Sequence, residues 1–391
     1  MRNRHHRIAP LSMAAVVLLG TAPLAGCYDT APHLPFPPIS RVPGDVLSPL
    51  RLVSLVSPRD PFAGQLVDVA DRIMAGEWIV KAGREAGVVP GKSVHAASPS
   101  LPGGPLEDAQ LTRWLRDAVD GGRVPAPDGN TLYLIWLPDG FTLLWNGREN
   151  TDCRYVRGYH RPFGDGGDVM AVIPRCPDEN LDDLSVQGAH ELIEAASDPA
   201  RDDTNPGTPR ADAWAENVWI ALAAAGAGIA DLCDGTRYRD GGILYPRVYS
   251  DRAAKEGGDP CIPAQSTPYF NTSSSVEWYP LEWDGSTTVP ITGWSTGEVP
   301  PWRILMGLRR ASDPTIDFNV KLQDPANPDA IIEPLIDNRQ ALTLSVRAGS
   351  AVDPGFWAAI EVDSYPEPGS REATPDADRY HRALFGIYVI P

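Results

Sequence analysis

The sequence predicts an α+β fold in two domains: an α+β domain with a mixed sheet over residues 46–265, and an all-β sandwich domain over residues 266–391. Three observations support this. With 391 residues, the chain is too long for one modest hydrophobic core. Up to about residue 265, apolar residues at helical spacing alternate with short, continuous apolar runs. From about residue 267, β-branched and aromatic runs are separated by turn residues at even spacing, which is typical of a β-sandwich.

The N-terminus, residues 1–26, is typical of a secretory signal. Three arginines precede an apolar run that ends in Leu-Ala-Gly-Cys. This ending resembles the bacterial lipobox, so we expect cleavage before Cys27 and a lipid on Cys27. An ordinary signal peptide followed by a chance cysteine is the alternative. The next residue, Tyr28, is not aspartate, so we expect no retention at the inner membrane and a lipid anchor in the outer membrane of a bacterial cell envelope.

Residues 27–45 predict an extended tether, because five of the eighteen residues that follow Cys27 are proline. The formal net charge of the chain is −17, which argues against nucleic acid as a partner. The expected partners are therefore the membrane, through the N-terminal lipid, and a peptide or other cell-surface substrate.

Four cysteines remain after Cys27, an even number that predicts two disulfides in an exported chain. Of the three possible connectivities, Cys153–Cys176 and Cys233–Cys261 are favoured because each closes a local loop. A metal site made of thiolates is the alternative, and it is uncommon outside the cytoplasm.

Two helices are predicted before the first disulfide. Residues 65–87 carry apolar side chains near helical spacing, and Gly76 is a point at which this helix can split. Residues 106–122 have one apolar helix face and end in a Gly-Gly pair.

Strands are predicted from continuous apolar runs. Residues 130–138 form a buried strand, and residues 141–145 are expected to pair with it as a hairpin across Pro-Asp-Gly. Residues 168–176 form a third strand. The short runs after residue 267 supply the sandwich, where we find no catalytic constellation.

A further helix follows the third strand and carries the sequence Gly-Ala-His-Glu-Leu-Ile-Glu-Ala-Ala-Ser-Asp-Pro. Asp182, Asp183 or Ser185 can cap its start, and Pro199 ends it. His190, Glu191 and Glu194 form an H-E-x-x-E motif, which resembles the H-E-x-x-H helix of zincins and predicts a zincin-like domain. The alternative is an ordinary amphipathic helix with a polar face.

The motif places a possible metal site on one helix stripe. His190 and Glu194 lie at i and i+4, so both side chains can reach one ion. Glu191 points slightly around the helix and can take a proton from water on that ion, the role of the glutamate in H-E-x-x-H. A catalytic zinc site needs a third protein ligand. Asp231 is the best remote candidate.

Other residues remain alternatives for the third ligand. Glu216 is the next candidate from the later chain. Asp198 lies on the same stripe as His190, although Asp-Pro at a helix end also serves as a turn. Zinc is the expected ion. A ligand set with two carboxylates also admits manganese, magnesium or calcium.

Residues 75–263 resemble the exported EXORDIUM-like, or phosphate-induced-protein-like, proteins, in the bacterial branch that carries SHELxEAxTDP and a later EIGDLC. The matching segments keep their order in this sequence: GEWIVKAGREAGVVPG, GNTLYLIWLP, GYH with VIPRC, GAHELIEAASDP, IADLC and VYSDRAAKEGGDPC. The resemblance implies an exported protein and, in the bacterial branch, a metal-dependent hydrolase. Plant members lack the histidine motif, so the fold does not require the chemistry.

Two positions refine what the resemblance implies. The glutamate of EIGDLC falls at Gly228 here, so the third ligand would have to be Asp231 or another residue. His160, in GYH, matches a recurrent histidine of the family. It is a further candidate ligand or a donor to a ligand, with a buried structural histidine as the alternative.

The sequence therefore predicts a metal-dependent hydrolase, most readily a peptidase, with Glu191 as base and His190, Glu194 and Asp231 as ligands. The alternative is a non-catalytic lipoprotein that binds the cell surface or matrix, with a structural ion or none.

Overall fold

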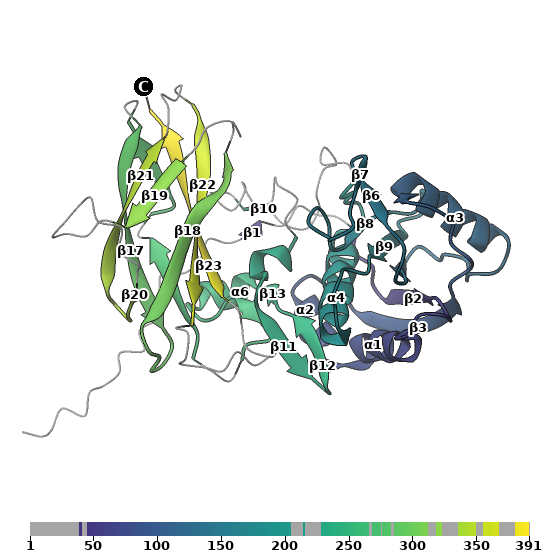
Figure 1. Cartoon of the computed structure of the whole chain (residues 1–391). Coiled ribbons are helices and arrows are strands. Elements are labelled where there is room, and N and C mark those ends of the chain that lie inside the picture. The colour runs from purple at the N-terminus through teal and green to yellow at the C-terminus, as the bar shows by residue number, and fades with distance from the viewer. Residues whose placement is uncertain are drawn as a thin grey trace, which may run out of the picture.

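The computed structural model contains α-helices and β-strands in a mixed α+β arrangement (Figure 1). It describes residues 39–40, 45–204, 214–215, 228–265, 268–274, 276–282, 285–311, 318–322, 335–348, 355–366 and 380–390. The expected signal, Cys27, most of the tether and Glu216 lie outside this part of the chain. Within it, no helix is long and apolar enough to cross a membrane.

A five-stranded sheet forms the centre of the first half of the chain. Its strand order is β3-β2-β5-β9-β8, and all neighbours are parallel except β8, the antiparallel outer strand. The strands are β2 (Leu50–Val56), β3 (Pro90–Ala97), β5 (Thr131–Trp136), β8 (Tyr159–Pro162) and β9 (Val169–Ile173). The hydrophobic runs of β2, β5 and β9 are therefore central strands, as expected where both faces of a sheet are covered.

The helices cover the two faces of this sheet. On one face, Leu52, Leu134 and Ala171 share a core with α1 (Ala63–Ala75), α2 (Glu77–Arg84) and α4 (Leu181–Ser197). On the other face, Val53, Ile135 and their neighbours pack with α3 (Asp108–Asp120). Because side chains alternate along a strand, each of the central strands contributes to both cores.

Helix α4 packs closely on the sheet, and this positions the H-E-x-x-E motif. Asn180 caps the helix by accepting hydrogen bonds from the backbone of Asp182 (2.8 Å) and Asp183 (3.1 Å). The sequence-based choice of Asp182, Asp183 or Ser185 as the cap is therefore wrong, because the helix begins earlier. At Gly188, an added Cβ would lie 2.2 Å from Cη2 of Trp136 in β5, so only glycine fits this contact.

One of two local predictions agrees with the structure and the other does not. Gly76 does separate α1 from α2, as its position in the predicted helix allows. The hairpin between residues 130–138 and 141–145 does not form. Instead, β6 (Leu143–Trp145) pairs with β4 (Leu106–Glu107) and β7 (Arg148–Glu149), because Leu143 packs with the core around α3.

The segments before and after α4 are each closed by one disulfide, and short strands follow α4. Cys153–Cys176 and Cys233–Cys261 are present, as the sequence favours. A short 3-10 helix, η1 (Asp231–Cys233), begins at Asp231. The remaining elements here are β1 (Ile39–Ser40), β10 (Trp214–Ala215), β11 (Arg237–Asp240), β12 (Ile243–Pro246), β13 (Val248–Tyr249), α6 (Asp251–Lys255) and β14 (Cys261–Ile262).

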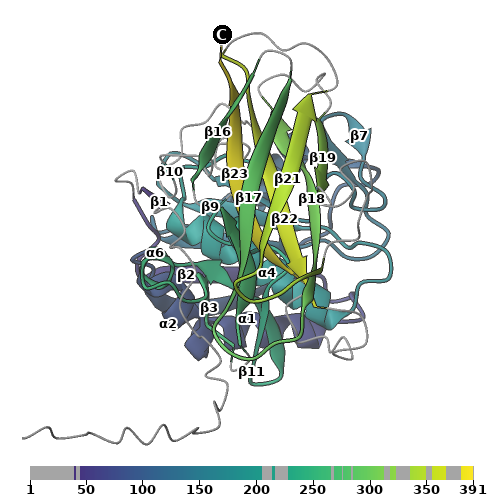
Figure 2. The same ribbon diagram turned by 90° about the vertical axis from the view of Figure 1, so that its left-hand side faces the viewer.

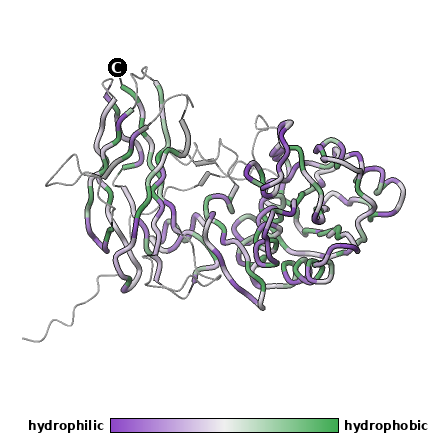
Figure 3. Tube along the Cα trace, viewed as in Figure 1, coloured by the Kyte–Doolittle hydropathy of each residue, from purple (hydrophilic) through white to green (hydrophobic). Residues whose placement is uncertain are grey.

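Two sheets make up the C-terminal part of the chain (Figure 2). One has the order β15-β17-β21-β19 and the other β16-β23-β22-β18-β20. Apolar side chains of both sheets form one hydrophobic core, and hydrophobic and hydrophilic residues recur along the strands (Figure 3). The strands are β15 (Phe270–Ser274), β16 (Trp278–Leu281), β17 (Ser286–Ser295), β18 (Trp302–Ala311), β19 (Phe318–Leu322), β20 (Leu335–Ile336), β21 (Ala341–Ala348), β22 (Trp357–Tyr365) and β23 (His381–Val389).

Candidate metal centre

The structure brings His190, Glu194 and Asp231 together, and we name these three residues the His190 group. One ligand atom from each lies within 4.8 Å of the others. His190 Nε2 is 3.5 Å from Glu194 Oε1 and 3.3 Å from Asp231 Oδ1. Helix α4 supplies the first two at i and i+4, and η1 supplies the third. Glu194 also ties the two elements together, because its Oε1 accepts the backbone N–H groups of Ala230 and Asp231, both at 3.1 Å.

The donor types and their spacing fit a divalent cation. Ligands placed tetrahedrally at about 2.0–2.2 Å from zinc are separated by about 3.3–3.6 Å. The two distances measured from His190 Nε2 agree with this range. One imidazole and two carboxylates form a set that binds zinc and also accepts harder ions. The side chains of His190 and Asp231 are 22% and 32% exposed, so an ion held by the three residues would keep one side open to solvent.

Arg201 adds a permanent positive charge to the His190 group. Its side chain is 7% exposed, with Nη1 3.3 Å from Glu194 Oε2 and Nη2 3.8 Å from Asp231 Oδ2. The guanidinium therefore contacts the carboxylate oxygens that face away from His190.

The charges of the group perturb its protonation. Burial would lower the pKa of His190, but the Glu194 and Asp231 carboxylates raise this pKa well above its usual value. Burial would raise the pKa of Asp231, but His190 and Arg201 lower it well below its usual range. Without a cation, the structure therefore favours a charged imidazole between two carboxylates.

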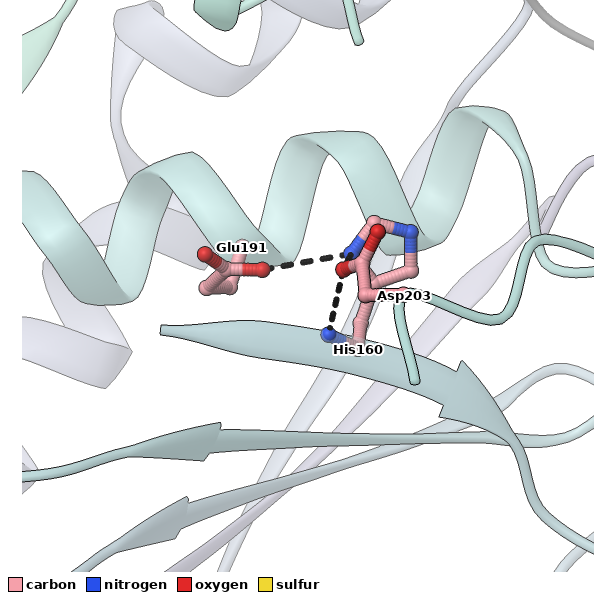
Figure 4. Close-up of side chains that lie close together, drawn as sticks. All are labelled: His160, Glu191 and Asp203. Atoms are coloured by element: carbon pink, nitrogen blue, oxygen red, sulfur yellow. Dashed lines mark hydrogen bonds and ion pairs between the residues drawn. The ribbon is translucent and has the colours of Figure 1, made fainter. Parts of the chain in front are cut away.

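Glu191 belongs to a second cluster, which we name the His160 group: His160, Glu191 and Asp203 (Figure 4). Nδ1 of His160 lies 3.2 Å from Glu191 Oε2 and 3.1 Å from Asp203 Oδ2. Oδ2 of Asp203 also accepts a hydrogen bond from the backbone N–H of His160 at 2.9 Å. Its Oδ1 accepts a hydrogen bond from Nε of Arg201 at 2.7 Å. Arg201 therefore connects the two groups.

Burial dominates the electrostatics of the His160 group. The imidazole of His160 is fully buried, and burial would lower its pKa, but the charge of Asp203 and the hydrogen bond to Glu191 raise the pKa to about 8. Burial also raises the pKa of Glu191, although the hydrogen bond to His160 opposes this effect. Burial would raise the pKa of Asp203, but the charges of His160 and Arg201 lower it.

A cavity of about 510 Å³ joins the two groups to the surface, because His190, Glu191 and Asp231 all line it. Residues just before β8 and around β11 form other parts of its wall. Tyr380, from the C-terminal part of the chain, also lines it and donates a hydrogen bond to Asp234 at 2.8 Å. The volume is within the range of small-ligand sites.

Three glycines allow close approach around the cavity. A Cβ at Gly158 would lie 2.6 Å from Glu191 Oε1, and one at Gly228 would lie 2.3 Å from Glu194 Cδ. Gly235 has φ +85°, and a Cβ there would lie 2.5 Å from Cε1 of Tyr380. At Gly228, Glu194 therefore occupies the space that a side chain would need.

The predicted residues fall into three sets. His190, Glu194 and Asp231 come together, and His160 contacts Glu191 rather than the His190 group. Asp198 is buried at the end of α4, where its N–H donates to the carbonyl oxygen of Glu194 at 2.8 Å. It is in neither group, and Glu216 lies outside the described residues. Arg201 and Asp203 were missed; the only signal was the charged run Arg-Asp-Asp directly after the motif.

Comparisons with known proteins do not assign a family. No family model and no curated protein matches the chain. Domains 4 and 5 of the S-layer protein SbsC are 11% identical, over 32% of this chain and 54% of that chain, with a TM-score of 0.19. The N-terminal domain of PorA is 13% identical, over 31% of this chain and 97% of that chain, with a TM-score of 0.20.

A β-glucosidase from Listeria innocua in complex with glucose is 10% identical, over 90% of this chain and 48% of that chain, with a TM-score of 0.20. The chain thus spans about half the length of the S-layer structure and of the glucosidase. TM-scores this low carry no conclusion about fold or activity, so any functional conclusion for this chain depends on the site itself.

Proposed function

We propose that this protein is a metal-dependent hydrolase of the bacterial cell envelope, anchored through Cys27, with a peptide as its favoured substrate. The observation that carries the proposal is the convergence of His190, Glu194 and Asp231 on the wall of a cavity that Glu191 also lines. Perturbed, buried ionisable groups in a cavity are a recurrent property of catalytic sites.

The His190 group would hold one divalent ion, with zinc expected first and manganese or calcium as alternatives. When bound, such an ion acts as a Lewis acid and activates water. Glu191 would serve as the base. The hydrogen bond from His160 fixes Oε2 of Glu191 and leaves Oε1 for the proton, and burial raises the pKa of this carboxyl toward the working range of a general base.

The favoured substrate class follows from the resemblance of the H-E-x-x-E motif to the zinc-protease helix. Strand β8 offers no free edge at His160, because Asp203 accepts a hydrogen bond from the N–H of this residue and donates its own N–H to the carbonyl oxygen. A peptide would therefore enter through the cavity that Gly158 and Glu191 line.

The proposed architecture has a zincin-like domain over residues 46–265 and a β-sandwich over 266–391. Support for the first comes from helix α4, which follows β9 and packs against a sheet whose outer strand is antiparallel. Support for the second comes from the single core shared by the two C-terminal sheets.

A non-catalytic binding lipoprotein is the second candidate, and Arg201 is the observation that favours it. Together with a charged His190, Arg201 can balance the carboxylates of Glu194 and Asp231 without any metal. In that case the charged cluster would be a structural network within a surface-binding protein.

Metal content and hydrolysis separate the two candidates. Purified protein would be dialysed against zinc, manganese and calcium, analysed for bound metal, and incubated with a mixed peptide library. We expect bound metal and cleavage in the wild type, loss of both in His190→Ala and Glu194→Ala, and retained metal in Glu191→Gln with turnover lower by about 10²–10⁴-fold.

Glu179→Gln is a matched control, because Glu179 is a half-buried glutamate that accepts the backbone N–H of Cys176 just before α4. It should keep both metal and turnover. A wild-type protein without a divalent ion after these dialyses would contradict the hydrolase and favour the binding protein.

A further inference from the structure

The two carboxylates of the His190 group divide their oxygens between two cationic side chains, in addition to the backbone N–H groups that Glu194 Oε1 and Asp231 Oδ2 accept. Oε1 of Glu194 and Oδ1 of Asp231 face Nε2 of His190, at 3.5 Å and 3.3 Å. The other oxygens, Oε2 and Oδ2, face the guanidinium of Arg201, at 3.3 Å and 3.8 Å. Each carboxylate therefore directs one oxygen toward the candidate metal position and the other toward a fixed positive charge.

Arg201 is itself held in place. Its Nε donates to Asp203 Oδ1 at 2.7 Å, and the side chain is buried. Arginine is planar, stays charged and binds carboxylates in a fixed orientation, so it suits this role better than lysine. Oδ2 of Asp231 also accepts the backbone N–H of Gly228 at 2.8 Å. Rotating either carboxylate toward a bidentate position would break these contacts.

We infer that Arg201 is a metal-selectivity residue that restricts Glu194 and Asp231 to one oxygen ligand each; this inference rests on the proposed metal site. Calcium takes six to eight oxygen ligands and commonly uses bidentate carboxylates, whereas catalytic zinc takes three protein ligands. One imidazole nitrogen and one oxygen from each of two carboxylates provide the three protein ligands of a catalytic zinc site. They provide too few oxygen ligands for calcium. The positive guanidinium also opposes additional coordination by the remaining oxygens.

The test is a comparison of zinc and calcium binding, measured by calorimetry with each metal alone. The wild type should bind zinc more tightly than calcium. In Arg201→Met, the second oxygens become available, and the ratio of calcium to zinc affinity should rise by at least about tenfold, the lower bound for changes in residues that orient metal ligands. Arg201→Lys keeps one charge but cannot contact both carboxylates, so it should give a smaller rise.

Arg175→Met is the matched control. Arg175 is 8% exposed and pairs with the buried Asp60 at 2.8 Å, so it is a comparable buried ion pair outside the two groups. This variant should leave the ratio of the two affinities unchanged. Circular dichroism would check the fold of each variant. If Arg201→Met does not fold, the ratio of calcium to zinc affinity in Arg201→Lys tests the inference.

The possible outcomes separate the two proposals. Zinc binding with an unchanged ratio in the Arg201 variants would overturn the selectivity role and leave the metal site intact. A wild type that prefers calcium would also overturn it. A wild type that binds neither metal would contradict the proposed function and, with it, this inference.

Discussion

His190 and Glu191 are adjacent in the sequence but belong to different clusters. His190 contacts Glu194 and Asp231, whereas Glu191 contacts His160. Successive helix residues point about 100° apart, so one turn of α4 can serve two groups. The groups are joined by Arg201, which contacts a carboxylate in each. A substitution in one group should therefore change the pKa values of the other group.

The protonation of His160 should make stability depend on pH. The pKa of His160 is raised from 6.5 to about 8 in the folded protein. Its contribution to stability is therefore fully present below pH 6.5 and is lost as the pH rises through 8, by on the order of 2 kcal/mol. In metal-free protein, urea unfolding across this range should show a smaller loss for His160→Gln than for the wild type.

His95→Gln provides the comparison, because His95 is a partly exposed histidine that pairs with Asp71 on the surface. It should retain the pH dependence of the wild type. An equal slope for His160→Gln and the wild type would show that His160 does not hold its proton more tightly in the folded state.

At the scale of single residues, the sequence predicts some contacts and not others. The approach of His190 to Glu194 follows from helix geometry, and the chemistry and position of Asp231 predict it as the third partner. The contact of Glu191 with His160 joins residues 31 positions apart, and helix periodicity says nothing about it. Arg201 and Asp203 lie in a polar segment whose path depends on tertiary packing, so no local pattern could place them.

Helix α4 depends on Gly188 for its distance from the sheet. Alanine at this position would place Cβ 2.2 Å from the ring of Trp136, a fully buried side chain that cannot easily move. Overpacking of this kind costs about 1–3 kcal/mol or more. We expect Gly188→Ala to lower the thermal unfolding midpoint and to weaken zinc binding, because the helix carries His190 and Glu194.

Gly64→Ala is the control for that substitution. Gly64 lies in the first turn of α1, where an added Cβ would meet no heavy atom within 4 Å. It should leave stability unchanged or raise it by up to about 1 kcal/mol. Equal effects of the two substitutions would argue against close packing of α4 on the sheet.

The disulfides should differ in their effect on the site. Cys233–Cys261 closes a separation of 28 residues, and Cys233 lies two residues after Asp231 in η1. Replacing both cysteines with serine should cost about 2–4 kcal/mol and weaken zinc binding. The same change at Cys153 and Cys176 should cost a similar amount of stability and affect zinc binding less. Equal zinc affinity in the two double variants would mean that the bridge does not position Asp231.

At the scale of elements, the continuous apolar runs at residues 130–138 and 168–176 correctly predicted strands, whereas the predicted pairing of neighbouring strands was wrong. The buried strands β5 and β9 and helices α1 to α4 were anticipated. The central strand β2 and the outer strand β8 were not predicted. Strand β3 was not predicted either, because most of its residues are partly or fully exposed and it contains glycine and lysine. The expected partner of β5 was wrong, because its neighbours β2 and β9 are brought beside it by tertiary packing.

Across the whole molecule, the mixed α+β class is confirmed, whereas the identity of the two domains stays a prediction. Neither the composition nor the apolar periodicity specifies how β-strands from distant parts of the chain are ordered. The parallel central sheet has crossover connections, and its order arises from packing of helices on both faces.

Membrane anchoring concerns the whole chain, and the lipid modification of Cys27 can test it. If the lipobox is used, mass spectrometry of membrane-extracted protein should show a diacyl or triacyl addition on an N-terminal Cys27. Cys27→Ser should release the protein from the membrane fraction. A wild-type product that begins elsewhere, or one with an unmodified Cys27, would contradict the lipid anchor.

The contact of Tyr380 with the loop after Asp231 limits how the protein can be shortened. A chain truncated at residue 265 would keep both charged groups and both disulfides, but Gly235 would lose the ring that covers it and Asp234 would lose its hydroxyl donor. The loop that presents Asp231 would then be open to water on a side that is now covered. Truncation would also remove Tyr269, Ala359, Ala383 and Leu384 from the core that α4 shares. Biochemical work on this protein therefore needs the β-rich part as well.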